Sequence, residues 1–134
     1  MGKIQPGAGL AIAIIVAHLA VNVLHGLAHQ RLAIEISPGE KLFVTAVILI
    51  APLVAGVLLL LKTWRVGAWL LVVSMAGALI FGIYKHFIAP GPDHAFGLHS
   101  SAWALVFQIT AVLLVVTEAT GCWAGMQILR EENS

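Results

Sequence analysis

Charged side chains are scarce in this sequence. Asp, Glu, Lys and Arg together make up 10% of its 134 residues, whereas 60% of the residues are hydrophobic and the mean hydropathy is +1.01. Soluble domains carry about 25% charged residues. A soluble core of this size has no room for so much apolar surface, so the composition excludes a soluble globular protein.

Two further scarcities exclude particular functions. Cys122 is the only cysteine, which rules out an internal disulfide and any mechanism that needs a pair of thiols. The formal net charge is only +1, and the chain has no basic stripe that would neutralise the phosphates of a nucleic acid. Nucleic acid is therefore excluded as a partner, and Cys122 is interpreted as an apolar packing residue.

What the chain does contain is four long stretches without Asp, Glu, Lys or Arg, at residues 4–30, 42–61, 66–84 and 94–117. A helix needs about 20 apolar residues to cross the hydrocarbon of a bilayer, and these stretches have 27, 20, 19 and 24 residues. The sequence therefore predicts a single all-α membrane domain, a bundle of four transmembrane helices with up-down-up-down topology and both termini on one side. The expected spans are residues 7–29, 40–62, 66–88 and 96–122.

Local signals predict one helix start, one kink and one hairpin. Ser37, Pro38 and Glu40 match a capping box with proline at the first helical position, so the second helix is expected to start at Pro38. Inside that helix, Pro52 removes one backbone hydrogen bond, which should kink the helix and free a carbonyl group that another helix or a water must satisfy. The link at residues 62–65 is so short that the second and third spans should pack as an antiparallel hairpin.

Small residues recur at four-residue spacing on two spans, which favours close packing of helices. These rows are Gly9, Ala13 and Ala17 on the first span, and Ser74, Ala78 and Gly82 on the third. We expect another helix to approach each row closely.

Lysine and arginine suggest the orientation in the membrane. The side that holds the N-terminus has four of these residues and the opposite side has three: Lys3, Lys62, Arg65 and Arg130 against Arg31, Lys41 and Lys85. This bias predicts cytoplasmic termini. We also expect the chain to be an integral membrane protein of a bacterial or archaeal inner membrane. The small parts outside the bilayer also predict a homo-oligomer or a larger membrane complex.

Polar residues of the first span form a single stripe. His18, Asn22, His25 and His29 are separated by 4, 3 and 4 positions, which at 100° per residue places them within a sector of roughly 60°. Four polar side chains would be costly against lipid, so this face must meet protein, water or a cofactor. His25 and His29 have the spacing at which two imidazoles of one helix bind the same metal ion.

A metal site is expected where this stripe meets the outer ends of the other spans, because His86 ends the third span and His99 begins the fourth at a comparable depth. The predicted ligands are His25, His29, His86 and His99. Imidazole suits zinc, copper, iron and nickel. Asp93 and His94, in the connecting loop, are expected to complete the coordination sphere or to orient a ligand.

Deeper polar residues have separate expected roles. His18 and Asn22 are predicted to relay the ion or a proton inward from the outer cluster. Glu118 lies near the inner end of the fourth span and is expected to reach headgroups or water.

Three functions follow from this pattern and remain open. The first is binding or handling of a transition-metal ion, which protonation of the imidazoles would release. The second is a redox or pigment subunit in which His25 and His99 hold haem b or a chlorophyll-type macrocycle. The third is a non-catalytic accessory subunit of a larger complex. An enzyme is not favoured, because Ser100, His99 and Asp93 lack the positional signature of a catalytic triad.

Overall fold

The computed structural model describes residues 5–131, which contain helices and no strand. The α-helices are α1 (Ala8–Arg31), α2 (Pro38–Phe43), α3 (Ala51–Leu59), α4 (Trp64–Ile83) and α5 (Ala102–Glu131). Two π-helices, η1 (Val44–Ile50) and η2 (Tyr84–Ile88), and a 3-10 helix, η3 (Ala95–Gly97), complete the elements. The predicted all-α class is confirmed.

Four helical segments are long and apolar enough to cross a membrane, which is consistent with an integral membrane protein. They are Ala8–Arg31, Pro38–Leu59, Trp64–Ile88 and Ala102–Glu131. Large apolar side chains face outward on these segments; Val23 exposes 66% of its surface and Ile80 exposes 70%. Several buried side chains are polar, among them three of the histidines. This distribution suits a protein whose outer surface contacts lipid and whose interior holds its polar groups.

The second of these segments begins as the sequence predicts. Pro38 is the first helical residue, the Ser37 hydroxyl accepts a hydrogen bond from the Glu40 backbone N–H, and the Glu40 carboxylate accepts one from the Ser37 N–H. This reciprocal pair satisfies two N–H groups that a helix start otherwise leaves open. The predicted capping box is therefore confirmed.

Pro52 also has the predicted consequence. Because proline has no N–H, it cannot donate to the carbonyl of Ile48, four residues earlier. The π-helix η1 ends at Ile50, two residues before this proline, and the Ile48 carbonyl lies 3.2 Å from the Nε2 atom of His18 on α1. A carbonyl only accepts, so His18 Nε2 donates this hydrogen bond. The prediction that another helix would satisfy a freed carbonyl is confirmed.

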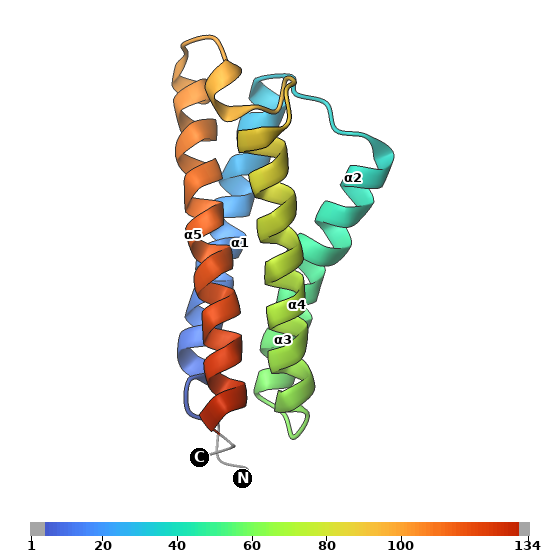
Figure 1. Cartoon of the computed structure of the whole chain (residues 1–134), viewed down its shortest axis with the longest axis vertical. Helices are drawn as coiled ribbons and strands as arrows, with labels where there is room; N and C mark the ends of the chain where they lie inside the picture. The colour runs from blue at the N-terminus through green and yellow to red at the C-terminus, as the bar shows by residue number, and fades with distance from the viewer. Residues whose placement is uncertain (1–4, 132–134) are drawn as a thin grey trace.

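The segment from α2 to α3 diverges from the other helices at its beginning. In Figure 1, α2 leans away from α1, α4 and α5, whereas α3 lies against α4. An ion pair between Glu40 Oε1 and Lys85 Nζ, at 2.6 Å, connects the first turn of α2 to η2. Both side chains are partly exposed, so this pair contributes little to stability, but it joins the two elements beside the cavity described below.

Glycines mark the closest helix contacts. A Cβ atom added at Gly67 would lie 2.8 Å from the Leu59 backbone nitrogen, and one at Gly125 would lie 2.7 Å from a Val72 side-chain carbon. On the predicted row of the third span, Ser74 and Ala78 are buried and Gly82 is partly buried. The predicted row on the first span faces outward instead, and nothing lies within 4 Å of a Cβ added at Gly9.

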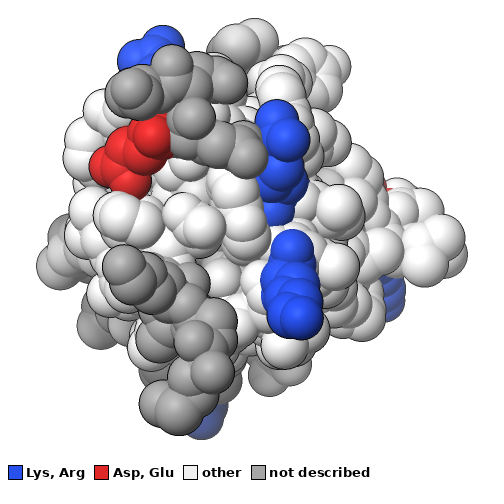
Figure 2. Space-filling view, turned by 90° about the horizontal axis from the view of Figure 1, so that it is seen from below, with Lys and Arg blue, Asp and Glu red and all other residues white. Residues whose placement is uncertain are grey.

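Charged residues lie mainly at the two ends of the helices. Figure 2 shows the end that lies at the bottom of Figure 1, where α3 connects to α4 and where α5 ends, and most of the visible surface there is uncharged. Lys62 and Arg65 belong to this connection or adjoin it, and Arg130 belongs to the end of α5. Lys3, which contributes to the predicted charge bias, lies outside the described residues.

Candidate metal centre

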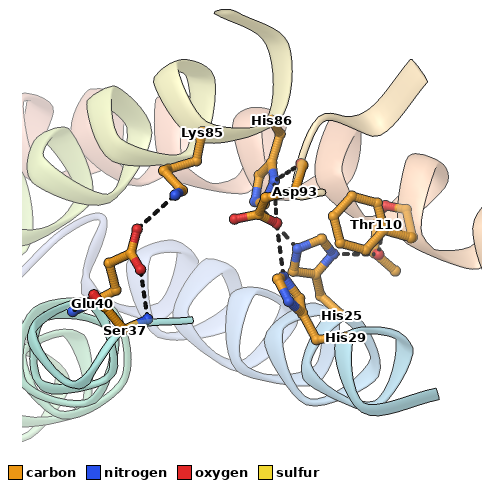
Figure 3. Close-up of polar contacts among 9 residues, drawn as sticks. His25, His29, Ser37, Glu40, Lys85, His86, Asp93 and Thr110 are labelled. Carbon is orange, nitrogen blue, oxygen red and sulfur yellow. Dashed lines mark hydrogen bonds and ion pairs between the residues drawn. The ribbon is translucent and has the colours of Figure 1, made fainter. Parts of the chain in front are cut away.

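Three histidines meet at one level of the bundle (Figure 3). His25 and His29 come from successive turns of α1, and His86 comes from the π-helix η2 that ends the third membrane-capable segment. The ring centroid of His25 lies 4.9 Å from that of His29 and 4.8 Å from that of His86. One ring nitrogen of each histidine lies within 4.8 Å of the others, so this triad could hold a metal ion.

The closest pair already has the spacing of two metal ligands. The Nε2 atoms of His25 and His86 are 3.3 Å apart, and both residues are 6% exposed. Zinc binds imidazole nitrogen at about 2.0 to 2.1 Å, and two such nitrogens on a tetrahedral ion are therefore about 3.3 Å apart. Both rings could bind one ion with little movement.

The other nitrogen of His25 is held by Thr110 of α5. Nδ1 lies 2.8 Å from the Thr110 hydroxyl, which itself donates to the Val106 carbonyl at 2.7 Å. A hydroxyl has one proton, so it accepts the hydrogen bond from His25 Nδ1–H. In a neutral imidazole the Nε2 atom then has no proton, and its lone pair points toward the triad.

His86 is held in the same way from the opposite side. Its Nδ1 lies 3.1 Å from the backbone carbonyl of Asp93 and 3.3 Å from the Asp93 Oδ1 atom. A carbonyl oxygen only accepts, so Nδ1 carries the proton and Nε2 carries a lone pair. The lone pairs of His25 Nε2 and His86 Nε2 therefore face each other.

Asp93 connects two of the three rings. Its Oδ1 atom lies 3.3 Å from His29 Nε2 as well as from His86 Nδ1, and the residue is 6% exposed. Burial raises the pKa of the Asp93 carboxyl, but the hydrogen bond from His86 and the electrostatic interactions with His86, His29 and Lys85 outweigh it and leave this pKa below its ordinary value. An ionised carboxylate that orients metal-binding imidazoles is a recurrent arrangement in metal sites.

His29 has one ring nitrogen without a partner. Its Nε2 lies beside Asp93, whereas its Nδ1 is buried and has no hydrogen-bond partner among residues 5–131. Buried polar atoms are nearly always paired. His29 therefore has a ring nitrogen that can accept a further partner.

Phe107 of α5 forms a wall of the triad. This side chain is fully buried, and its ring centroid lies 4.6 Å from that of His25, 5.0 Å from that of His29 and 5.3 Å from that of His86. The ring excludes water from one side of the imidazoles, which strengthens electrostatic interactions there. Phe107 was not expected at the metal site from the sequence, because an isolated phenylalanine in an apolar span has no distinguishing pattern.

Two of the predicted ligands lie elsewhere. The Ser101 hydroxyl accepts a hydrogen bond from the Ala104 N–H at the start of α5, so the helix begins at Ala102 and leaves His99 exposed in the preceding loop. His94 is partly buried and is not part of the triad. The structure therefore does not bring His99 to the triad, nor does it pair His99 with His25 as the haem or chlorophyll alternative requires.

His18 and Asn22 lie deeper on α1. His18 is 1% exposed, its Nδ1 lies 3.3 Å from the Thr117 hydroxyl, and its Nε2 donates to Ile48. The Asn22 amide nitrogen lies 3.0 Å from the same Nε2 and 3.0 Å from the His18 backbone carbonyl, to which it donates. His18 thus connects α1 to two other elements, whereas the predicted relay through it stays a prediction.

This contact predicts a structural effect of His18. A His18→Leu variant keeps an apolar side chain of similar size but leaves the Ile48 carbonyl without this donor. An unsatisfied buried carbonyl costs about 1 to 3 kcal/mol. The free energy of unfolding, measured with denaturant in detergent, should therefore fall by that amount. Thr117→Ala serves as the control, because it removes the hydroxyl beside His18 Nδ1 and leaves the hydrogen bond from His18 Nε2 to the Ile48 carbonyl in place. Equal stability of His18→Leu and the native protein would contradict this role.

A cavity of about 460 Å³ lies beside the triad. Its lining includes His25, His29, His86 and Asp93 at one level, and Asn22 and Glu118 at another. The sequence predicted that Glu118 reaches headgroups or water, but the structure buries it. It is 2% exposed, and its Oε2 atom has no hydrogen-bond partner in the described part of the chain. The prediction was wrong because the acid was placed near the inner end of a span that was expected to end at residue 122, whereas α5 continues to Glu131.

No family model, curated protein or solved structure matches this chain.

Proposed function

We propose that the protein binds a transition-metal ion within the membrane through His25, His29 and His86, and that Asp93 orients two of these rings. The observation that carries the proposal is the 3.3 Å separation of the His25 and His86 Nε2 atoms, with both Nδ1 atoms held as donors. Two lone pairs at this distance repel each other. A metal ion bound by both turns the repulsion into two favourable bonds.

The ligand set favours a metal that prefers nitrogen. Imidazole suits zinc, copper, iron and nickel, whereas magnesium and calcium prefer oxygen. Three protein ligands would leave a fourth position open on a four-coordinate ion, as in sites that exchange ligands. The open position supports handling of the ion, by capture and transfer, and the proposed route inward passes Asn22 and His18.

We also propose how the chain lies in the membrane. His25 of α1 contacts Thr110 of α5, and His18 contacts Thr117, so these two helices run in opposite directions along each other. This pairing supports an up-down-up-down bundle with both termini on the cytoplasmic side of a bacterial or archaeal inner membrane. The triad then lies near the outer face, and the short connections favour a homo-oligomer or a larger membrane complex.

Elemental analysis tests the function directly. Protein purified in neutral detergent, loaded separately with zinc, copper, iron and nickel and then desalted, should retain about one equivalent of a preferred metal per chain. Retention of none of them would contradict the proposal. A visible spectrum of the native protein distinguishes the alternative, because a Soret band would identify a haem macrocycle instead of a bare ion.

An Asp93→Asn variant should weaken metal binding without removing a ligand. Asparagine keeps the shape of the side chain, but it no longer supplies the negative charge beside His29 and His86. Loss of such an outer partner typically costs about 10- to 100-fold in metal affinity. Competition with a chelating dye measures this change, and Glu35→Gln, an exposed acid in the α1–α2 connection, is the control. Unchanged affinity of Asp93→Asn would show that the carboxylate does not support the site.

A further inference from the structure

Glu118 differs from the other acids of the described chain because it is buried within a membrane-capable helix without a charged partner. It is 2% exposed, no ion pair joins it to another described residue, and its Oε2 atom is unpaired. An unpaired charge inside a membrane protein costs several kcal/mol, by order of magnitude. Such a group is retained where it has a function. Its partner is then a cation that residues 5–131 do not supply.

The Glu118 carboxyl lies in the same cavity as the triad but at a different level. A Cβ atom added at Gly82 of α4 would lie 3.7 Å from Glu118 Oε2. Gly82 precedes His86 by one helical turn, or about 6 Å along the helix. Because Gly82 has no side chain, the carboxyl oxygen faces open space in the cavity instead of a neighbouring side chain.

The rest of the cavity is mainly apolar. Its walls at this level include Ile48, Ala78, Phe81 and Leu114. A volume of about 460 Å³ is within the range of about 300 to 1,000 Å³ that small-molecule sites occupy. A small metal ion does not fit this part of the cavity, because one carboxylate among apolar walls cannot replace its hydration shell.

The cavity also has a mouth on the outer surface. Gly26 and Gln30 of α1 and Lys41 of α2 line it and are exposed, so the opening lies between α1 and the diverging α2. Lys41 lies on the exposed side of this mouth. A molecule that partitions into the bilayer could therefore reach Glu118 sideways from the lipid.

We propose that this cavity binds a lipophilic organic cation, an amine or onium ion with an apolar body, and that the Glu118 carboxylate pairs with its charge. The apolar walls bury the body of the ligand, and the ligand supplies the positive charge that the described residues lack at this position. The proposal goes beyond the metal site and does not depend on a bound metal.

Tetraphenylphosphonium and tetraphenylborate test the proposal as a cation and an anion of nearly the same shape. Equilibrium dialysis is carried out on the full-length protein in neutral detergent with a chelator present. We expect saturable binding of the phosphonium ion and none of the borate. Glu118→Gln should weaken phosphonium binding by about tenfold or more, because it removes a desolvated charge pair. Gly82→Leu should weaken it as well, by filling the space beside the carboxyl.

Two control variants separate this site from other effects. Glu131→Gln changes an exposed acid at the end of α5 and should leave phosphonium binding unchanged. Thr110→Ala removes the partner of His25 Nδ1 but lies outside the cavity lining. It should therefore weaken metal binding and keep phosphonium binding, so failure of one site does not imply failure of the other. The proposal is overturned if folded Glu118→Gln and native protein bind the phosphonium ion equally, if both tetraphenyl ions bind equally, or if neither binds.

Discussion

Metal retention is expected to be lost when His25 or His86 is replaced by alanine. Each variant removes one Nε2 atom of the pair that lies 3.3 Å apart, so the remaining two histidines can no longer enclose an ion. The loss of affinity should exceed the roughly 10- to 100-fold that follows from removing an outer partner. Metal content after desalting, measured by mass spectrometry of the elements, should fall from about one equivalent toward zero.

His99→Ala is the matched control for this experiment. It also removes an imidazole near the same end of the bundle, but His99 is exposed in the loop before α5 and lies outside the triad. Its metal content should match that of the native protein. Equal metal in His25→Ala and the native protein would reject the triad, and a loss in His99→Ala would show that His99 reaches the ion.

Much of the fold could be predicted because it depends on local chemistry. Long charge-free stretches must form helices where no water satisfies the backbone, and Ser37 with Glu40 marks a helix start through hydrogen bonds within a single turn. Pro52 predicted a carbonyl in need of a partner for the same reason. The identity of that partner, His18, was not predicted, because it depends on how α1 is rotated against η1.

Some residues of the candidate site could likewise be predicted from the local sequence, whereas others depend on how the helices pack. His25 and His29 were predictable from their spacing on one helix, and His86 from its place at the end of a span. The position of His99 depended on where α5 begins, and the loop with η3 and the Ser101 cap shifts that start to Ala102. Thr110 and Phe107 contact the triad only through packing between helices, which the sequence of one helix does not reveal.

The burial of Glu118 could have been predicted from the helical periodicity of α5, although its charge pointed to a different position. Buried residues of α5 recur every three or four positions, and Glu118 falls on this stripe between Leu114 and Gly121. Its charge suggested the end of a span, whereas its position in the repeat indicated the interior. Extending the period past the acid would have placed its carboxyl inside the bundle.

The largest effect on folding is expected from Gly67→Ala, at the contact between α3 and α4. A Cβ atom at this position would lie 2.8 Å from the Leu59 backbone nitrogen and 2.9 Å from the Ala55 carbonyl oxygen. Backbone atoms cannot rotate away as a side chain can, so the two helices must separate. Overpacking of this kind costs about 1 to 3 kcal/mol, which should appear as a lower midpoint of unfolding in detergent.

Gly9→Ala provides a comparison in which the same chemical change should have the opposite sign. Nothing lies within 4 Å of a Cβ atom added at Gly9, which is exposed near the start of α1. Alanine there reduces the conformational freedom of the unfolded chain and should stabilise the protein slightly, by about 0.5 to 1 kcal/mol. If both variants shifted the midpoint equally, the close approach of α3 and α4 at Gly67 would be disproved. A drop confined to Gly67→Ala would establish that the short link at residues 60–63 holds these two helices in direct backbone contact.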